Sequence, residues 1–267
     1  MTPPICLSIA GFDGSAGAGL LADIKTFAAL GCYGTSVITA VTSQNTQGVA
    51  AIHPLSGMQV TEQLQVVCSD MPPAAIKIGM VFSLEIMQAI HAFVVSLCDR
   101  VPVILDPVMV ATSGDSLFDQ CAIEFMRQEL LPLVTLITPN AAEARLLLGE
   151  SISKKESLAK QLVATGVQAA LVTQHNGIDE WCDGTQNHRL VLPEIHTRNT
   201  HGTGCSLSSA IAACMARGED SLNAVAAAKN YVWQAIDAAK NWQLGQGHGP
   251  LNHFIQVHDD VTAVPIA

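Results

Sequence analysis

ICLSIAGFDGSAGAGLLAD, residues 5–23, joins a short apolar run to an amphipathic stretch through a loop rich in glycine. The apolar run at residues 5–10 predicts a buried strand. Residues 18–30 carry apolar side chains at helical spacing, which predicts a helix. A strand, a tight loop and a helix in this order form the repeating unit of α/β proteins with a parallel sheet.

The same alternation continues along the chain. Apolar runs predict further strands at residues 37–41, 75–80, 103–106, 133–138 and 169–173, and weaker ones at 180–182 and 189–192. Amphipathic stretches predict helices at residues 84–97, 122–131, 141–148, 154–165, 203–217 and 221–241. We therefore expect one domain over residues 1–267, built as a three-layer α/β/α sandwich with a mostly parallel central sheet. Such sheets bind ligands beyond the carboxyl ends of their strands.

Composition narrows the class of protein. The 267 residues are 49% hydrophobic and 13% charged, with a formal net charge of -10 and no cluster of Lys or Arg, so we expect no nucleic-acid or membrane partner. The eight cysteines are far apart and form no C-x-x-C pair, which indicates reduced thiols without a zinc site or disulfide framework. The N-terminus lacks the pattern of a signal peptide, and no apolar run reaches the roughly 18 residues of a membrane span. We expect a cytoplasmic protein.

A second glycine-rich turn, HGTGCSLSSA at residues 201–210, runs directly into a predicted helix. The backbone N–H groups of Gly202, Thr203, Gly204 and Cys205 can converge at the helix N-terminus, where the helix dipole favours an anion. The same dipole predicts a lowered pKa for Cys205. An anion site beside a proton acceptor suits phosphoryl transfer to an alcohol. The alternative is a loop before a buried helix, with Cys205 as a small core residue.

The first glycine loop admits a competing interpretation. Gly17, Gly19 and Ala22 fit the dinucleotide pattern G-x-G-x-x-A, but no acidic residue follows between Asp23 and Glu62 to bind a ribose, and the loop lacks a P-loop ending. We therefore expect the loop to close over a small planar substrate, with Asp23 and Gln44 as its polar partners. The alternatives are a solvated carboxylate for Asp23 and a polar turn residue for Gln44.

Six segments in a fixed order carry a resemblance to a known family. They are AGFDGSAGAGLLADIKT (10–26), KIGM (77–80), DPVM (106–109), TPNAAEA (138–144), HGTGC (201–205) and GQGHGPLNH (245–253). Over residues 5–255 the chain resembles hydroxymethylpyrimidine/phosphomethylpyrimidine kinase of thiamine biosynthesis, in the ribokinase superfamily. The resemblance implies a ribokinase-like fold, ATP and Mg2+ as cofactors, and a homodimer.

The resemblance also implies a reaction and a substrate site. The γ-phosphate of ATP would pass to 4-amino-5-hydroxymethyl-2-methylpyrimidine and then to its monophosphate. The pyrimidine would be held at the positions Ala18, Asp23, Gln44, Met80, Val108 and Cys205. Cys205 would activate the hydroxymethyl oxygen in the first step and would matter less in the second, because a phosphate acceptor needs no base at neutral pH.

On the nucleotide side, the resemblance implies that Asn140 and Glu143 organise Mg2+ through water near the ATP phosphates. The same spacing is also that of a helix capping box. Asp106 follows a buried apolar run, where a lone carboxylate must be paired or face a cleft, so we expect it to bind metal or phosphate. Lys77 and Lys229 are the candidate cations. The resemblance places Lys229 near the ATP phosphates, and its alternative is a solvated helix lysine.

The chain departs from the family pattern at one loop. Family members commonly carry Lys-Gly-Gly-His after the strand that ends near residue 172, whereas this chain reads TQHNG at residues 173–177. The missing cation bears on the nucleotide contacts. Two rival functions remain from the sequence: a pyridoxal kinase, and a non-catalytic pyrimidine-binding protein.

Overall fold

The computed structural model describes residues 2–97, 101–109, 120–149, 152–153, 155–174, 177–255 and 264–266. Within these residues, ten strands form one sheet in the order β10-β9-β8-β7-β6-β5-β4-β1-β2-β3. The strands are β1 (Ile5–Asp13), β2 (Tyr33–Asn45), β3 (Gly48–Pro54), β4 (Ala75–Ile78), β5 (Val103–Leu105), β6 (Leu136–Ile137), β7 (Ala169–Val172), β8 (Ile178–Cys182), β9 (Asn187–Val191) and β10 (Val264–Ile266). From β7 to β2 the neighbours are parallel, and the outer strands pair antiparallel.

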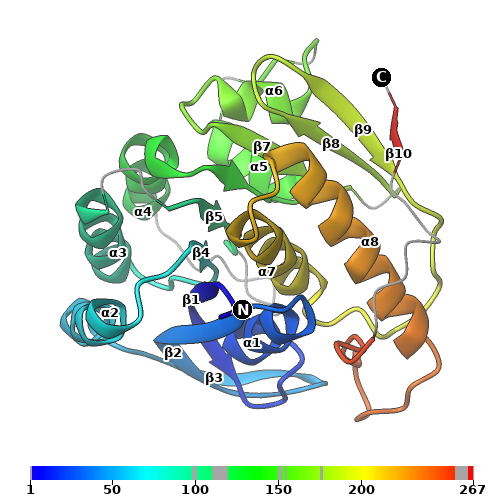
Figure 1. Ribbon diagram of the computed structural model, residues 1–267, viewed down its shortest axis with the longest axis horizontal. Helices are drawn as coiled ribbons and strands as arrows, with labels where there is room; N and C mark the ends of the chain where they lie inside the picture. The colour runs from blue at the N-terminus through cyan, green and yellow to red at the C-terminus, as the bar shows by residue number, and fades with distance from the viewer. Residues whose placement is uncertain are drawn as a thin grey trace.

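Helices cover both faces of this sheet (Figure 1). The helices are α1 (Gly19–Ala29), α2 (Gly57–Asp70), α3 (Leu84–Ser96), α4 (Gln120–Phe125), α5 (Ala141–Leu148), α6 (Leu158–Val163), α7 (Thr203–Ala216) and α8 (Ser221–Ala239). A π-helical turn (Met126–Leu130) and a 3-10 turn (Leu131–Leu133) follow α4. The predicted three-layer α/β/α arrangement with a mostly parallel sheet is confirmed.

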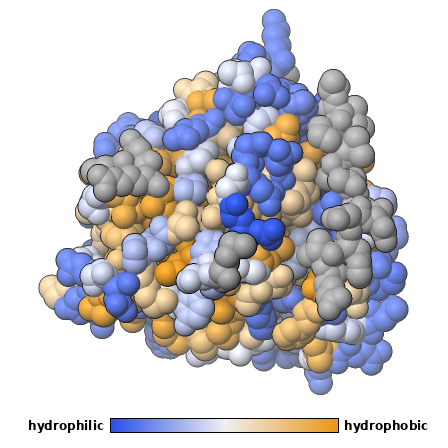
Figure 2. Space-filling view, in the orientation of Figure 1, coloured by the Kyte–Doolittle hydropathy of each residue, from blue (hydrophilic) through white to orange (hydrophobic). Residues whose placement is uncertain are grey.

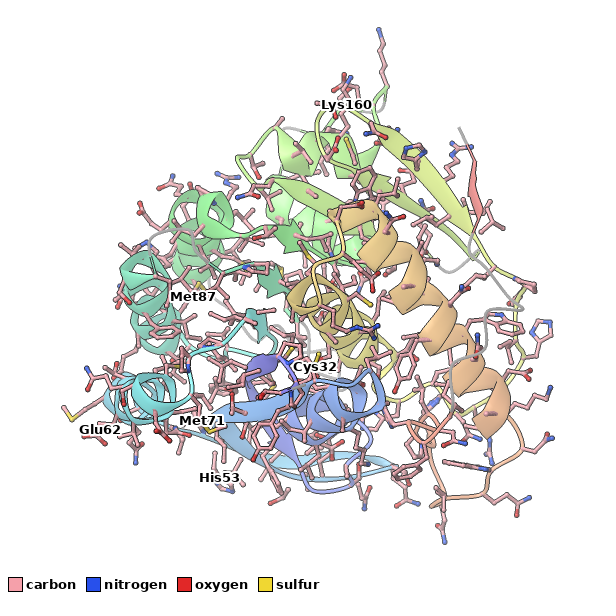
Figure 3. All side chains as sticks on the ribbon, in the orientation of Figure 1. Cys32, His53, Glu62, Met71, Met87 and Lys160 are labelled. Atoms are coloured by element: carbon pink, nitrogen blue, oxygen red, sulfur yellow. The ribbon has the colours of Figure 1, made fainter. Side chains whose placement is uncertain are left out.

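Each face of the sheet has its own apolar core, because successive strand residues point to opposite faces. Leu7 and Ile9 of β1 pack in the core with α2 to α6, whereas Cys6 packs in the core with α1, α7 and α8. Met87 lies fully buried on α3, and Glu62 and Lys160 lie at the outer edge of the molecule (Figure 3). Ser8 of β1 and Lys77 of β4 are buried on the face that α1 and α7 cover, beneath the loops at the strand ends.

Several predicted elements differ from the observed ones. The predicted strand 37–41 extends to the whole of β2 because β1 pairs with its first half and β3 with its second half, and neither β3 nor α2 was predicted. The sequence of α2 gives a weak signal because it buries few side chains. The predicted helix 122–131 divides into α4 and the π-helical turn, and the predicted helix 154–165 shortens to α6, with residue 154 outside the described residues.

The outer surface agrees with the sparse charge of the chain. Hydrophilic side chains gather along the upper edge of the face shown in Figure 2, over α6 and the β8–β9 hairpin, with apolar side chains interspersed below them. Among the residues that the structure describes, no helix is long and apolar enough to cross a membrane.

Candidate active site

Three cavities lie where the parallel strands end. The first cavity, of about 130 Å³, lies between the first glycine loop and the end of β2. The third cavity, of about 470 Å³, lies between α7 and α8. The second, of about 730 Å³, shares residues with both. The residues at 203–205, where α7 begins, line all three, with Cys205 at the first and second and Gly204 at the second and third. The N-terminus of α7 therefore separates the first cavity from the third.

The first cavity brings together most of the residues predicted to hold the substrate. These are Ala18, Gln44, Met80, Val108 and Cys205. They come from α1's N-cap position, β2, the loop after β4, the loop after β5 and α7. Four strand-end segments and one helix therefore converge on a cavity of about 130 Å³, as the topology of a parallel sheet requires.

The two glycine-rich segments touch each other. Gly202, which caps α7, has φ of 83°, and a Cβ there would overlap the carbonyl oxygen of Gly17. Only glycine combines this left-handed backbone with so close an approach. Of the four N–H groups predicted to converge on an anion, that of Thr203 donates to the carbonyl oxygen of Thr200 at 3.2 Å. The turn is thus held in part by its own backbone.

The prediction of a lowered pKa for Cys205 is wrong. Burial raises the pKa of the Cys205 thiol to about 12, and the charges of Asp106 and Asp23 add to this rise. The Lys77 cation and a hydrogen bond from the Gly19 backbone oppose it without overcoming it. The sequence signal of a helix N-terminus was outweighed because the low dielectric of the pocket penalises a thiolate. Cys205 is a neutral thiol at pH 7.

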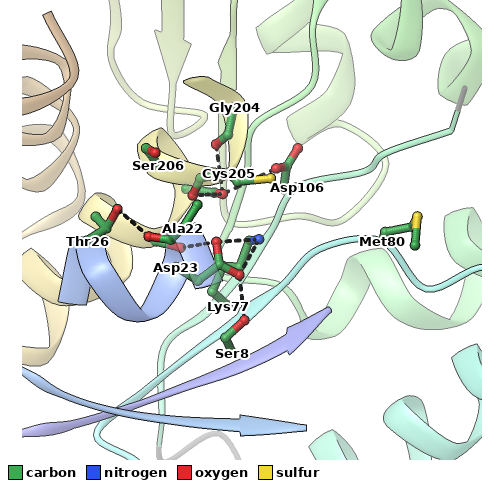
Figure 4. Close-up of polar contacts among 12 residues, drawn as sticks. Ser8, Ala22, Asp23, Thr26, Lys77, Met80, Asp106, Gly204, Cys205 and Ser206 are labelled. Carbon is green, nitrogen blue, oxygen red and sulfur yellow. Dashed lines mark hydrogen bonds and ion pairs between the residues drawn. The ribbon is translucent and has the colours of Figure 1, made fainter. Parts of the chain in front are cut away.

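Asp23 does not line the first cavity and is fully buried. Its carboxylate binds Lys77 Nζ at 2.8 and 3.0 Å, and it accepts hydrogen bonds from Ser8 Oγ at 2.5 Å and Ser209 Oγ at 2.8 Å (Figure 4). The expected contact between Asp23 and a substrate edge would require breaking one of these bonds. The structure also departs from the alternative of a solvated carboxylate.

Lys77 occupies the wall between Asp23 and the first cavity. Its side chain is fully buried and lies in the lining of that cavity. Burial alone would lower the pKa of Lys77, but the charge of Asp23 and the other acidic groups nearby raise it above its ordinary value. The lysine is therefore a cation beneath the substrate site, balanced by one carboxylate.

Two residues of the first cavity, Asp13 and His201, were absent from the predicted site. His201 Nε2 lies 2.8 Å from Asp13 Oδ2 and 3.3 Å from Gln44 Nε2. Although burial raises the pKa of Asp13, hydrogen bonds from His201, Ser15 and Ala18 together lower it below its ordinary value. Both residues stand in quoted motifs, but 188 positions separate them, so their spacing carries no signal.

The second cavity collects the predicted metal and phosphate residues, Asp106, Asn140 and Glu143. Burial raises the pKa of Asp106 to about 6, with Asp23 adding to the rise and Lys77 opposing it. Burial also raises the pKa of Glu143 to about 7, and the Asp106 charge adds to that rise. Among the described residues, no group of three His, Cys, Asp or Glu side chains is arranged to hold a metal directly.

Asn140 and Glu143 also form the capping box considered from the sequence. Asn140 Oδ1 accepts hydrogen bonds from the N–H groups of Ala142 and Glu143 at 2.9 Å, and Asn140 N–H donates to Glu143 Oε2 at 2.9 Å. One carboxylate oxygen thus serves the helix, while Glu143 still lines the second cavity. The structural and the functional interpretations are compatible.

The third cavity contains the other candidate cation. Lys229 of α8 is 9% exposed and forms an ion pair with Asp179 of β8, so it is not a solvated helix lysine. Asp179 also accepts a hydrogen bond from Gln174 N–H at 3.0 Å. Asp179 was not predicted, because the sequence gives no sign that β8 packs against α8. Within the departing loop, residues 175 and 176 lie outside the described residues.

Known proteins resemble this chain over nearly its full length. A sequence model of phosphomethylpyrimidine kinase matches residues 13–252. The hydroxymethylpyrimidine/phosphomethylpyrimidine kinase of Rhizobium meliloti is 47% identical over 259 residues, covering 94% of this chain and 97% of that protein. The phosphomethylpyrimidine kinase of Clostridium difficile has a TM-score of 0.74 at 35% identity, covering 87% of this chain and 99% of its own.

A pyridoxal kinase shares the fold as well. The Staphylococcus aureus enzyme, solved with AMP-PCP and with pyridoxal, gives TM-scores of 0.86 and 0.84 at 29% and 30% identity, each covering 100% of both chains. These neighbours confirm the ribokinase-like fold, and the family model with the Rhizobium relative confirms the resemblance inferred from the motifs. The chain belongs to the phosphomethylpyrimidine kinase family.

Proposed function

We propose that this protein transfers the γ-phosphate of ATP to 4-amino-5-hydroxymethyl-2-methylpyrimidine and then to the resulting monophosphate. The observation that carries the proposal is the position of Cys205 and Gly204 between the three cavities. A small planar ring suits the 130 Å³ first cavity, and the larger third cavity suits a nucleoside. Phosphoryl transfer requires the acceptor and the triphosphate to meet in line, which the second cavity permits.

On the acceptor side, we assign the ring to Ala18, Gln44, Met80 and Val108. Apolar groups at three of these positions would clamp the ring faces, and the Gln44 amide would read the polar edge. We do not assign Asp23 to the ring, because its oxygens are taken by Lys77, Ser8 and Ser209. Asp23 instead keeps the lysine charged and in place.

The acceptor proton is assigned to Cys205. At its raised pKa the thiolate is scarce at neutral pH, but Lys77 lowers that pKa and would stabilise the anion as the proton is transferred. General-base assistance of this kind contributes about 10² to 10⁴ in rate. The monophosphate acceptor is already an anion, so its phosphorylation would depend less on Cys205.

The second cavity fits Mg2+ together with ATP phosphates. Asp106 and Glu143 face one cavity with the Asn140 amide, and burial raises the pKa of both carboxyl groups. A dication bound there would favour the charged forms of both. Mg2+ prefers a few oxygen donors from the protein, with water completing its coordination shell. Bound there, the ion would neutralise charge on the transferring phosphate. The α7 turn, Gly202 to Cys205, would hold the phosphates from the other side, and Lys229, which lines the third cavity, would hold them where the second and third cavities meet.

The test is an ADP-release assay with Mg-ATP and three acceptors: the hydroxymethylpyrimidine, its monophosphate and pyridoxal. Turnover of both pyrimidines supports the proposal. Turnover of pyridoxal alone would favour the second candidate, which the Staphylococcus aureus neighbour suggests. Binding without ADP release would indicate a non-catalytic pyrimidine-binding protein. We also propose a homodimer, which light scattering during gel filtration checks.

A further inference from the structure

Three polar side chains from distant parts of the chain meet at the rim of the first cavity. Asp13 ends β1, Gln44 lies near the end of β2, and His201 lies two residues before α7. All three line the cavity. The His201 ring is fixed from the other side by Gly17, where a Cβ would overlap ring atom Cδ2. The site therefore holds an imidazole at a defined position against an amide.

The carboxylate of Asp13 determines which ring nitrogen of His201 carries a proton. Asp13 already accepts hydrogen bonds from Ser15 N–H at 2.9 Å, Ser15 Oγ at 2.8 Å and Ala18 N–H at 3.0 Å, and it is an acceptor alone when ionised. His201 Nε2 lies 2.8 Å from Asp13 Oδ2, so Nε2 must be the protonated nitrogen. Its one proton is directed at Asp13 Oδ2, so Nε2 cannot accept a hydrogen bond from the Gln44 amide, and it can share that proton with an amide oxygen only in a three-centre hydrogen bond.

This requirement fixes the Gln44 amide. With Gln44 Nε2 at 3.3 Å from His201 Nε2, two donors face each other, and Gln44 Oε1 lies 3.1 Å from Thr42 Oγ1. The single Thr42 hydroxyl proton has a better acceptor in the Phe12 carbonyl oxygen, at 2.9 Å. Turning the amide by 180° places its oxygen against His201 Nε2–H and its nitrogen against the Thr42 oxygen. The His201 Nε2–H, the Thr42 hydroxyl and one Gln44 N–H then each face an acceptor, and oxygen and nitrogen of an amide are interchangeable in shape.

The oriented amide keeps one N–H and one oxygen lone pair for a ligand. This pair is complementary to a ring on which an amino group adjoins an unprotonated nitrogen, as in the 4-aminopyrimidine. In that substrate the hydroxymethyl group adjoins the amino group on its other side. An amide turned the opposite way would bind the ring with its two sides exchanged, which would move the hydroxymethyl group to the other side of the bound ring. Pyridoxal lacks an amino group beside its ring nitrogen.

We propose that Asp13 and His201 are positioning residues that hold the Gln44 amide in one orientation and so select an aminopyrimidine bound with one orientation of its ring. The inference rests on the proposed function for its substrate. It gives Asp13 a role beyond capping the glycine loop, and it gives the first residue of the HGTGC motif a role in specificity.

The experiment measures how strongly the protein distinguishes 4-amino-5-hydroxymethyl-2-methylpyrimidine from the analogue without the amino group. Calorimetry gives the ratio of the two Kd values, and ADP release gives kcat and KM for each. Turnover of the amino compound by the wild type tests the proposed function, whereas the ratio of Kd values tests the inference and does not require turnover. The wild type should prefer the amino compound by about 100-fold, the upper range expected when a buried polar group is left without its hydrogen-bond partner.

In His201→Ala that preference should fall to about threefold, because a free amide adopts either orientation. In Asp13→Asn the residue at position 13 no longer requires a proton on His201 Nε2, so the ratio of Kd values should be intermediate. His201→Gln keeps an N–H donor and should retain more of the preference than His201→Ala. His196→Ala serves as the matched control, since that side chain is 87% exposed. Equal weakening of both ligands in His201→Ala, with the ratio preserved, would overturn the inference and leave a structural role.

Discussion

Replacing Lys77 by methionine isolates the buried charge pair beneath the first cavity. Asp23 would keep Ser8 and Ser209 as hydrogen-bond donors but would lose Lys77 as its ion-pair partner, with both side chains of the pair fully buried. Removing one partner of a buried pair costs about 3–5 kcal/mol of the free energy of unfolding. At about 2–4 °C per kcal/mol for a chain of this size, Tm should fall by roughly 6–20 °C.

Differential scanning calorimetry measures this loss directly. The double variant Asp23→Asn with Lys77→Met leaves no unpaired charge and should recover most of the lost Tm. Lys160→Met is the matched control, because its ion pair with Glu156 is solvent-exposed and should contribute less than about 1 kcal/mol. If Asp23→Asn alone keeps the wild-type Tm and only raises KM for the pyrimidine, the carboxylate reads the substrate, and the reasoning from its buried partners is refuted.

Three further substitutions test the site, and a fourth tests the packing of His253 against α7. Cys205→Ala should lower kcat for the hydroxymethyl acceptor by about 10² with a smaller loss for the monophosphate, whereas Cys68→Ala, outside the cavities, should change neither. In the wild type, kcat for the alcohol should rise about tenfold per pH unit at neutral pH, because the thiol that loses its proton has a pKa of about 12. Glu143→Gln keeps the helix cap but removes a charge, so the Mg2+ concentration at half-maximal rate should rise by about tenfold at unchanged Tm. Asp179→Asn leaves a buried cation unpaired, so Tm without nucleotide should fall and the stabilisation by ATP, read from Tm, should grow. Burial lowers the pKa of His253 from 6.5 to about 4. As pH falls from 6.5 to about 4, the unfolded state therefore binds a proton before the folded state does, and about 3 kcal/mol of the free energy of unfolding should be lost. His253→Gln should flatten the dependence of Tm on pH in this range.

The fold was predictable because it rests on local patterns. The apolar run of β1 followed by a glycine loop and α1 gives the parallel unit, and its repetition gives the central strands. The elements that escaped prediction bury little: α2 buries only Gly57, Val60 and Leu64 of its 14 residues. The hairpin of β2 and β3 escaped because its second half is only partly buried, so neither face carries a clear apolar alternation.

The sequence predicted which residues line the site better than it predicted their pKa values and their pairing partners. Motifs identified Cys205 and Asp106, the family resemblance identified Gln44, and the structure places all three around connected cavities. The pKa of Cys205 depends on burial and on two carboxylates from distant segments, which no local pattern contains. Likewise, Asp23 is separated from Lys77 by 54 positions, so its pairing followed only from the arrangement of α1 against β4.

The glycine loops illustrate why a local motif can indicate the right place with a different physical role. A dinucleotide loop uses its glycines to approach a pyrophosphate. Here Gly17 and Gly202 let two segments of the protein itself approach, since a Cβ at Gly202 would overlap the Gly17 backbone and a Cβ at Gly17 would overlap His201. That approach brings His201 to Asp13, and it brings Cys205 beside the first loop, where Gly19 donates a hydrogen bond to it. Gly17 and Gly202 therefore let the end of β1 and the N-terminus of α7 meet at the first cavity, and a side chain at either position would separate His201 from Asp13 and Cys205 from Gly19.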